Sequence, residues 1–161
     1  MRFPRSFVVA ALCVLALTLI AFAQTRKAGL YQVTSTMTWQ QSPFPGMNPM
    51  GNGPHVTKIR VTQEQIDKYG TVPPQAHGDC RLTDINKTAH GMTADLVCSG
   101  HMQGKGTVQA AWTDDSHSTS KVHFTGEMQM GPSSKPFEWT VESSSVYEGS
   151  DCGSVKPLST E

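Results

Sequence analysis

Alternation of apolar and polar side chains recurs along this chain, and it constrains the fold more than any other feature. From Leu30 to Gln41, alternate positions fall on opposite faces of an extended strand: Tyr31, Val33, Met37 and Trp39 against Gln32, Thr34, Thr36 and Thr38. A period of two with one polar face is typical of an antiparallel sheet that covers a core. The sequence therefore predicts an all-β domain.

The same alternating pattern continues in short segments. They are separated by Gly, Pro, Asn, Asp and Ser, which favour turns. We predict strands over residues 30–41, 55–62, 80–86, 92–99, 106–113, 120–130 and 136–147, with turns at 114–117 and 131–134. Sequential strands joined by turns indicate an antiparallel up-and-down meander, as a curled sheet or a small barrel.

One short helix is predicted over Gln63–Tyr69. Thr62 stands where an N-cap is needed, and Gln65 follows three residues later, which is the spacing of a capping box. The segments on either side of this region, 42–54 and 71–79, are rich in Pro and Gly and predict loops.

The N-terminus has the three parts of a cleavable export signal: basic Arg2 and Arg5, an apolar run from Phe7 to Ile20, and small residues in Ala21-Phe22-Ala23. The alternative is a membrane anchor, but the run is shorter than the roughly 20 residues needed to span a bilayer. We expect cleavage after residue 23 and one domain over 24–161, ordered from about 28 to 152. The domain would be periplasmic or extracellular, without a membrane span after cleavage.

Charge excludes one class of partner. The chain carries 13 basic and 13 acidic residues, spread without clusters, and loss of Arg2 and Arg5 with the leader makes the remainder slightly acidic. Nucleic-acid binding normally requires a basic face. We therefore expect no nucleic-acid partner.

Cys80 and Cys98 can face each other across a hairpin. If they pair, Leu82 lies opposite Leu96, Asp84 lies opposite Ala94, and the turn centres on Ala89. Directly opposed residues are close enough for a disulfide, which would stabilise the fold by about 3 kcal/mol. Cys152 would then be left unpaired or bonded to another molecule, since three cysteines remain after cleavage.

The same hairpin also permits a metal site. His77-x-x-Cys80 and Cys98-x-x-His101 are mirror-image pairs that resemble a zinc or copper quartet. Met47, Met50, Met128 and Met130, with Met102 beside His101, add soft thioether ligands that suit copper. The alternative is that Met37, Met92, Met128 and Met130, which fall on apolar strand faces, fill the core. Oxidation of both thiols after export opposes the metal site.

Catalytic motifs are absent from the sequence: it has no Gly-x-Ser-x-Gly, no His-Glu-x-x-His and no phosphate-binding loop. Asp114, Asp115, Ser116 and His117 are the residue types of a triad, but they are contiguous, and a triad needs side chains from separate elements. We expect neither an enzyme nor a cofactor.

Several short motifs occur in an order that resembles one family. They are Gly29-Leu-Tyr-Gln-Val-Thr34, Val61-Thr-Gln-Glu64, Gly104-Lys-Gly-Thr107, Gly126-Glu-Met-Gln-Met130 and Tyr147-Glu-Gly-Ser-Asp-Cys152. This sequence resembles domain of unknown function 3617, a family of small exported bacterial proteins. The resemblance implies export and a β-rich fold but no activity. Family members often have a cysteine where Arg60 stands here; if that cysteine normally pairs with the terminal one, Cys152 has lost its partner.

Two function hypotheses follow. The first is non-catalytic binding of a small apolar or amphipathic molecule, or of an envelope protein, by aromatic side chains on a concave sheet. The residues predicted to face such a ligand are Tyr31, Trp39, Trp112, Phe124 and Trp139. The alternative is extracytoplasmic copper or zinc binding through His77, His101 and Met102.

Overall fold

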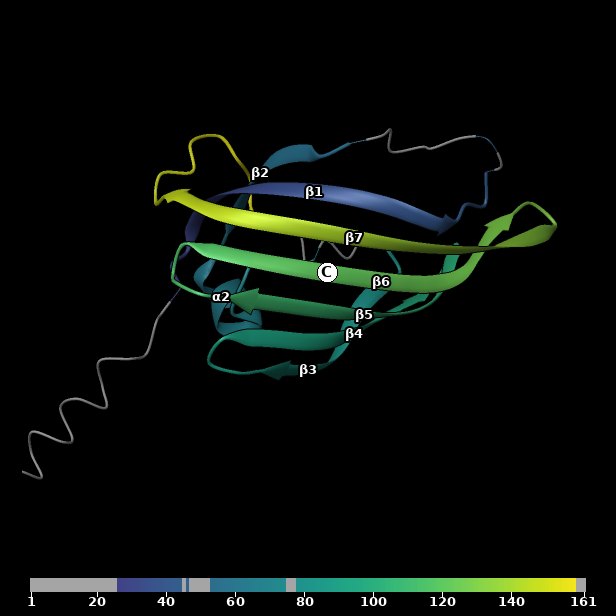
Figure 1. Cartoon of the computed structure of the whole chain (residues 1–161), viewed down its shortest axis with the longest axis horizontal. Coiled ribbons are helices and arrows are strands. Elements are labelled where there is room, and N and C mark those ends of the chain that lie inside the picture. The colour runs from purple at the N-terminus through teal and green to yellow at the C-terminus, as the bar shows by residue number, and fades with distance from the viewer. Residues whose placement is uncertain (1–25, 45, 47–52, 75–77, 159–161) are drawn as a thin grey trace, which may run out of the picture.

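The computed structural model describes residues 26–44, 46, 53–74 and 78–158 (Figure 1). Its elements are β1 (Gly29–Gln41), β2 (His55–Val61), α2 (Gln63–Tyr69), β3 (Cys80–Lys87), β4 (Gly91–Ser99), β5 (Met102–Trp112), β6 (His117–Met130) and β7 (Ser133–Gly149). All seven predicted strands and the predicted helix are present, so the all-β class with one short helix is confirmed over the described residues. The predicted leader, 1–23, lies outside the described residues.

The strands form one antiparallel sheet in the order β2-β1-β7-β6-β5-β4-β3. Strands β3 to β7 follow one another as a meander, and β1 extends it by pairing with β7. The two edge strands, β2 and β3, are therefore consecutive in sequence, and the segment that joins them contains α2.

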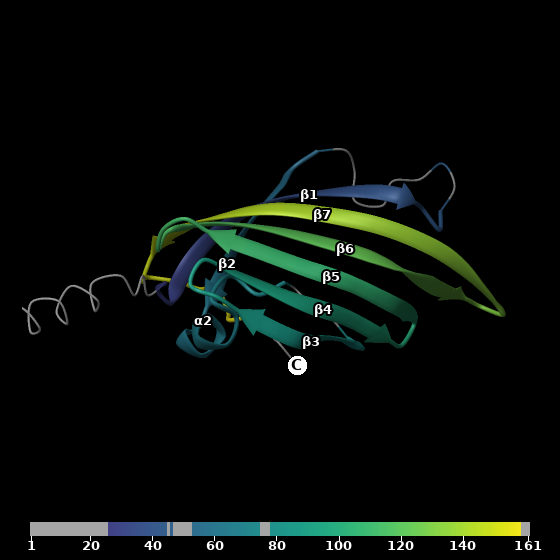
Figure 2. The same ribbon diagram turned by 60° about the horizontal axis from the view of Figure 1, so that its bottom comes forward.

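The sheet is not closed into a barrel and is not strongly curled, so the predicted curled sheet or small barrel is wrong (Figure 2). Closure would require β2 to pair with β3, and these strands do not pair over the residues that the structure describes. Figures 1 and 2 place α2 against one face of the sheet. Because α2 covers part of that face, the sheet can bury apolar side chains without rolling up.

The two faces of the sheet differ sharply. On the face that α2 covers, apolar side chains form a larger cluster, which includes Val108, Trp112 and Phe124, and a smaller one around Tyr31 and Ile59. The opposite face is polar, and along β5 exposed side chains such as Thr107 and Gln109 alternate with the buried ones. This alternation confirms the period-two reading of the sequence.

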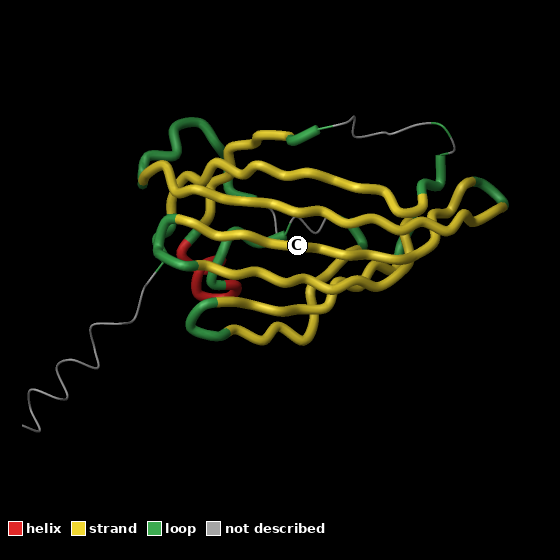
Figure 3. The backbone as a smooth tube through the Cα atoms, viewed as in Figure 1, coloured by secondary structure: helices red, strands yellow, loops and turns green. Residues whose placement is uncertain are grey.

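The short helix α2 begins and ends where the sequence predicts (Figure 3). The Gln65 backbone N–H donates to Thr62 Oγ1 at 3.2 Å, and the Thr62 N–H donates to Gln65 Oε1 at 2.9 Å, which completes the capping box. Gly70 ends the helix at φ 72°, and a Cβ atom there would lie 2.6 Å from the Trp112 ring. Ile66 joins the smaller apolar cluster and Tyr69 the larger. Within the described part of the chain, no helix is long and apolar enough to cross a membrane.

The β3–β4 hairpin contains the predicted disulfide. Cys80 lies opposite Cys98 with Cα atoms 4.0 Å apart, and their sulfurs are bonded. Leu82 lies opposite Leu96 as predicted, but Asn86 pairs with Thr93, so the predicted pairing of Asp84 with Ala94 is wrong. The reason is a bulge between Thr83 and Asn86, where Asp84 has a φ of 51°. A bulge inserts an unpaired residue and shifts the register beyond it.

Arg26, the first described residue, is buried against the turn between β5 and β6, with 4% of its surface exposed. Its guanidinium donates to the carbonyl oxygens of Asp114 at 3.2 Å and His117 at 2.8 Å, and to Ser118 Oγ at 3.3 Å. Ser118 Oγ also lies within hydrogen-bonding distance of Thr71 and Ser145. These contacts fix the start of the domain to the end of the sheet.

Candidate cross-strand groove

The five aromatic residues predicted to face a ligand lie on the apolar face, but most are enclosed. Tyr31 and Phe124 are fully buried and Trp112 is 5% exposed, while Trp39 and Trp139 are half-buried. Phe124 stacks on Trp139 at 5.4 Å between ring centroids and on Phe137 at 5.6 Å, and Phe137 meets Trp39 edge-on. The structure thus gathers Phe124, Trp139, Trp39 and Trp112 in the larger apolar cluster, whereas Tyr31 packs in the smaller one. A ligand-facing role for these residues stays a prediction.

Among the described residues, those of the metal alternative do not form a metal-binding group. Cys80 and Cys98 are bonded to each other, so neither is a thiolate ligand. His101 is exposed in the β4–β5 turn, and Met102 lies opposite Met128. His77, Met47 and Met50 lie outside the described residues. Among those that are described, no group of three or more His, Cys, Asp or Glu side chains is placed to hold a metal ion.

Cys152 is half-buried and unpaired. Its thiol points toward the Ser150 carbonyl oxygen, 3.7 Å away. This agrees with the odd cysteine count that remains after the predicted cleavage.

The predicted turn Asp114–His117 is a closed local network. Asp114 Oδ1 accepts from the backbone N–H groups of Ser116 and His117, each at 2.7 Å, and these bonds hold the pKa of Asp114 below its ordinary value. A hydrogen bond from Lys27 lowers the pKa of Asp115 in the same way. The carboxylates therefore stabilise the turn that receives Arg26.

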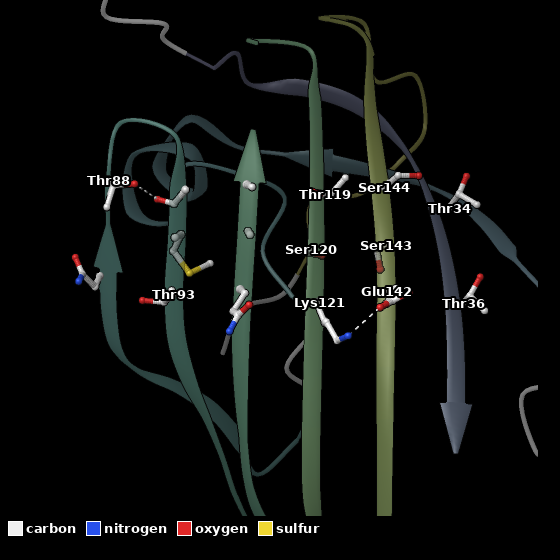
Figure 4. Close-up of a pocket in the computed structure, with 16 residues that line it drawn as sticks. Thr34, Thr36, Thr88, Thr93, Thr119, Ser120, Lys121, Glu142, Ser143 and Ser144 are labelled. Carbon is white, nitrogen blue, oxygen red and sulfur yellow. Dashed lines mark hydrogen bonds and ion pairs between the residues drawn. The ribbon is translucent and has the colours of Figure 1, made fainter. Parts of the chain in front are cut away.

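A different feature lies on the polar face: a shallow groove of about 820 Å³ that crosses the strands (Figure 4). The register of the sheet explains it. One continuous row of directly opposed residues runs across six strands: Thr36 on β1, Glu142 on β7, Lys121 on β6, Gln109 on β5, Thr93 on β4 and Asn86 on β3. All six line the groove. We call this the first ladder.

A second ladder lies beside the first, two residues along each strand. It consists of Thr34 on β1, Ser144 on β7, Thr119 on β6, Ala111 on β5 and Gly91 on β4, and Thr88 in the β3–β4 turn extends it. Ala111 and Gly91 are neighbours and carry almost no side chain. The side of the groove formed by β4 and β5 is therefore low, and a ligand can approach the strand backbone most closely there.

The floor between the ladders comes from four residues whose side chains point to the other face: Met92, Ala110, Ser120 and Ser143. Figure 4 shows Ser120 and Ser143 between the flanking side chains of Thr119, Lys121, Glu142 and Ser144. Every lining residue thus belongs to one of three adjacent cross-strand rows or to the turn at Thr88. The groove is a direct product of strand register.

Charge within the groove is balanced. Lys121 Nζ and Glu142 Oε1, directly opposed on β6 and β7, lie 3.0 Å apart. The other described lining residues carry hydroxyl, amide or apolar side chains, or none. The groove therefore presents hydrogen-bonding groups and methyl groups without net charge.

Comparison of the sequence with known protein families gives a match. A family model described as a protein of unknown function (DUF3617) matches residues 26–152. The chain belongs to the DUF3617 family. No curated protein and no solved structure is found to match it. The recognition made from the short motifs is therefore confirmed.

The DUF3617 match covers the parts of the fold that form the groove. It begins at Arg26, contains both ladders and the Cys80–Cys98 disulfide, and ends at Cys152. The DUF3617 description names no ligand or reaction. Function in this family member must therefore be argued from its own geometry.

Sequence reasoning missed the groove because it treated each strand separately. The polar face of each strand is visible in the alternation, but the alignment of Thr36, Gln109 and Asn86 requires the register of six strands. A sequence signal does exist: Thr34, Thr36, Thr93, Gln109 and Thr119 are uncharged polar residues on the exposed faces of their strands. Such positions commonly carry charged side chains.

Proposed function

We propose that this DUF3617 member is an exported, non-catalytic binding protein, and that a small amphipathic ligand lies in the cross-strand groove. The proposal depends on one observation, namely that the groove runs along the two polar ladders. Ligand sites are concave and commonly occupy about 300–1,000 Å³, and the groove volume of about 820 Å³ falls in this range.

The lining supports an amphipathic ligand. Hydroxyl and amide groups of Thr93, Gln109 and Asn86 can donate and accept hydrogen bonds, while Ala111 and the threonine methyl groups offer apolar contact. The aromatic side chains, by contrast, mostly satisfy one another in the core. We therefore assign ligand binding to the polar face in preference to the aromatic face.

A non-catalytic role is supported by the chemistry of the lining. A nucleophile or general base needs a partner that activates it. The titratable side chains in the described lining are Lys121 and Glu142, and they pair with each other in the open. This arrangement supplies recognition without an activated group.

Export is supported by two independent features. The N-terminal residues have the pattern of a cleavable leader. Cys80 and Cys98 form a disulfide, a bond that persists in oxidising compartments outside the cytosol. The domain then acts in the periplasm or outside the cell.

The test is native mass spectrometry of protein purified from its native compartment, with two matched variants. Ala111→Trp fills the groove over β5, whereas Thr107→Trp adds the same side chain on the same strand and face outside it. We expect a co-purified mass in the wild type and in Thr107→Trp, and its loss in Ala111→Trp. Absence of any bound mass, or equal retention by both variants, would overturn the proposal.

A further inference from the structure

The groove has a shape and chemistry that identify a class of ligand. We propose that it binds an uncharged, linear chain of sugar units, laid across the strands along the two ladders. This inference rests on the proposed function and deepens it.

The two ladders match the hydrogen-bonding groups of a sugar. Thr36, Thr93, Thr119 and Ser144 present hydroxyl groups, each of which donates one hydrogen bond and accepts others. Gln109 and Asn86 add amides, which donate and accept through separate atoms. A sugar hydroxyl also donates and accepts, so it can pair with either kind of side chain.

The groove is long and reaches both sides of the described sheet. From Thr36 to Asn86 the first ladder crosses five inter-strand steps, which at strand spacings of about 4.8 Å corresponds to about 24 Å. β2 pairs with β1 only from Gly29 to Ser35, so Thr36 lies beyond it, and Asn86 lies on the edge strand β3. A site of this shape accommodates a chain of several units whose ends extend past the sheet.

Charge selects against ionic ligands. An anionic or cationic chain would have to compete with the Lys121–Glu142 pair, which follows Thr36 in the first ladder. A neutral chain leaves that pair intact. The methyl groups of the threonines, with Ala111, can contact the C–H faces of sugar rings while the ladders bond the hydroxyl groups.

An extended peptide fits the groove less well. Peptides that bind sheets commonly take their main-chain hydrogen bonds from a free strand edge. Across the centre of the groove, β4, β5, β6 and β7 are paired on both sides, so their backbone groups are occupied. A peptide on this face would depend on side chains alone for its many amide groups.

The test uses linear β-1,4-linked oligomers of glucose and of N-acetylglucosamine, from two to six units, added to protein produced from the full chain. Backbone and side-chain amide shifts would be followed by NMR. We expect shifts centred on Thr93, Gln109 and Thr119, and an affinity that rises with oligomer length until the groove is filled. Gln109→Leu should weaken binding about tenfold, since it removes hydrogen bonds that sugar makes directly.

The matched control is Gln103→Leu, on the same strand and the same exposed face but outside the groove. It should leave the affinity unchanged. Binding without length dependence, or equal loss in the Gln103 and Gln109 variants, would overturn the proposal.

The co-purified ligand separates this inference from the proposed function. If a peptide, a lipid or a charged molecule occupies the groove, the sugar assignment fails while the proposed function stands. If Ala111→Trp displaces nothing, both fail.

Discussion

The Phe124 ring packs closely against Gly106, and a Cβ atom on that glycine would come within 2.9 Å of the ring. Gly104 and Gly126 lie beside it in the register, and a Cβ on either would also approach the same ring to 2.9 Å. Gly104, Gly106 and Gly126 therefore form one packing surface, which we call the glycine bed. The aromatic ring can approach this backbone closely because these residues have no side chains. The stack of Phe124 on Phe137 and Trp139 is built on this bed.

Gly106→Ala is expected to destabilise the domain by about 2 kcal/mol, because overpacking a buried contact typically costs about 1–3 kcal/mol. The added methyl would also meet the His123 carbonyl oxygen at 2.3 Å, so the ring cannot relieve the clash by itself. Urea unfolding measures the change. Thr107→Ala, next in the strand and exposed, is the control, and an equally small effect at both positions would contradict the contact.

Replacing both Cys80 and Cys98 by alanine is expected to lower stability by about 3 kcal/mol, because the bond closes a loop with a sequence separation of 18 residues. Guanidinium unfolding measures the change. Thiol labelling supplies the control: folded wild-type protein should expose no reactive thiol at these two positions. Labelling of Cys80 or Cys98 without a reductant would contradict the bridge.

Arg26→Met is expected to destabilise the domain by about 3 kcal/mol, because it removes charge-assisted hydrogen bonds to two carbonyl oxygens at a buried site. The neighbouring Lys27→Met is the matched control. Lys27 forms an exposed ion pair with Asp115, and such pairs typically contribute under about 1 kcal/mol. Chemical unfolding measures the stability of both variants. Similar losses of stability would show that the buried hydrogen bonds of Arg26 contribute no more than the exposed ion pair of Lys27.

Stability is expected to fall as the pH drops below about 4, in part through Asp114. Backbone N–H groups lower the pKa of Asp114 in the folded state. A carboxyl with a lowered folded pKa stabilises the fold above its unfolded pKa, and this contribution is lost as the pH falls through the folded value. Asp114→Asn should therefore reduce the acid sensitivity of thermal unfolding. An NMR titration that placed the Asp114 pKa at or above 3.8 would contradict this prediction.

Local structure was predictable from sequence where one segment contains its own signal. The bounds of α2 follow from Thr62 and Gln65, and the disulfide register follows from Cys80, Leu82, Leu96 and Cys98. The bulge at Asp84 was not predictable, because the pairing of Cys80 with Cys98 gives no sign of where an unpaired residue shifts the register further along the hairpin. The meander from β3 to β7 was predicted from its sequential turns, but the pairing of β1 with β7 was not, because alternation identifies a strand without identifying its neighbours.

The site was less predictable than the fold. Phe124 and Tyr31 are both fully buried, Phe124 against the glycine bed and Tyr31 edge-on to Tyr147, and their ligand-facing role stays a prediction. The groove depends on Thr36 and Asn86 reaching one row from opposite ends of the sheet, and only the register of every strand between them reveals it.

Because β1 pairs with β7, the sheet can be completed only after the last strand is available. Leu30 pairs with both Arg60 and Gly149, so the first strand of the sheet lies beside the last. During synthesis β1 and β2 can form only a two-stranded hairpin, which is marginally stable by itself. The two ladders remain incomplete until β7 has emerged, and such long-range pairing is characteristic of slow folding. A chain truncated before β7 would therefore lose both the groove and the strand that unites the two halves of the sheet.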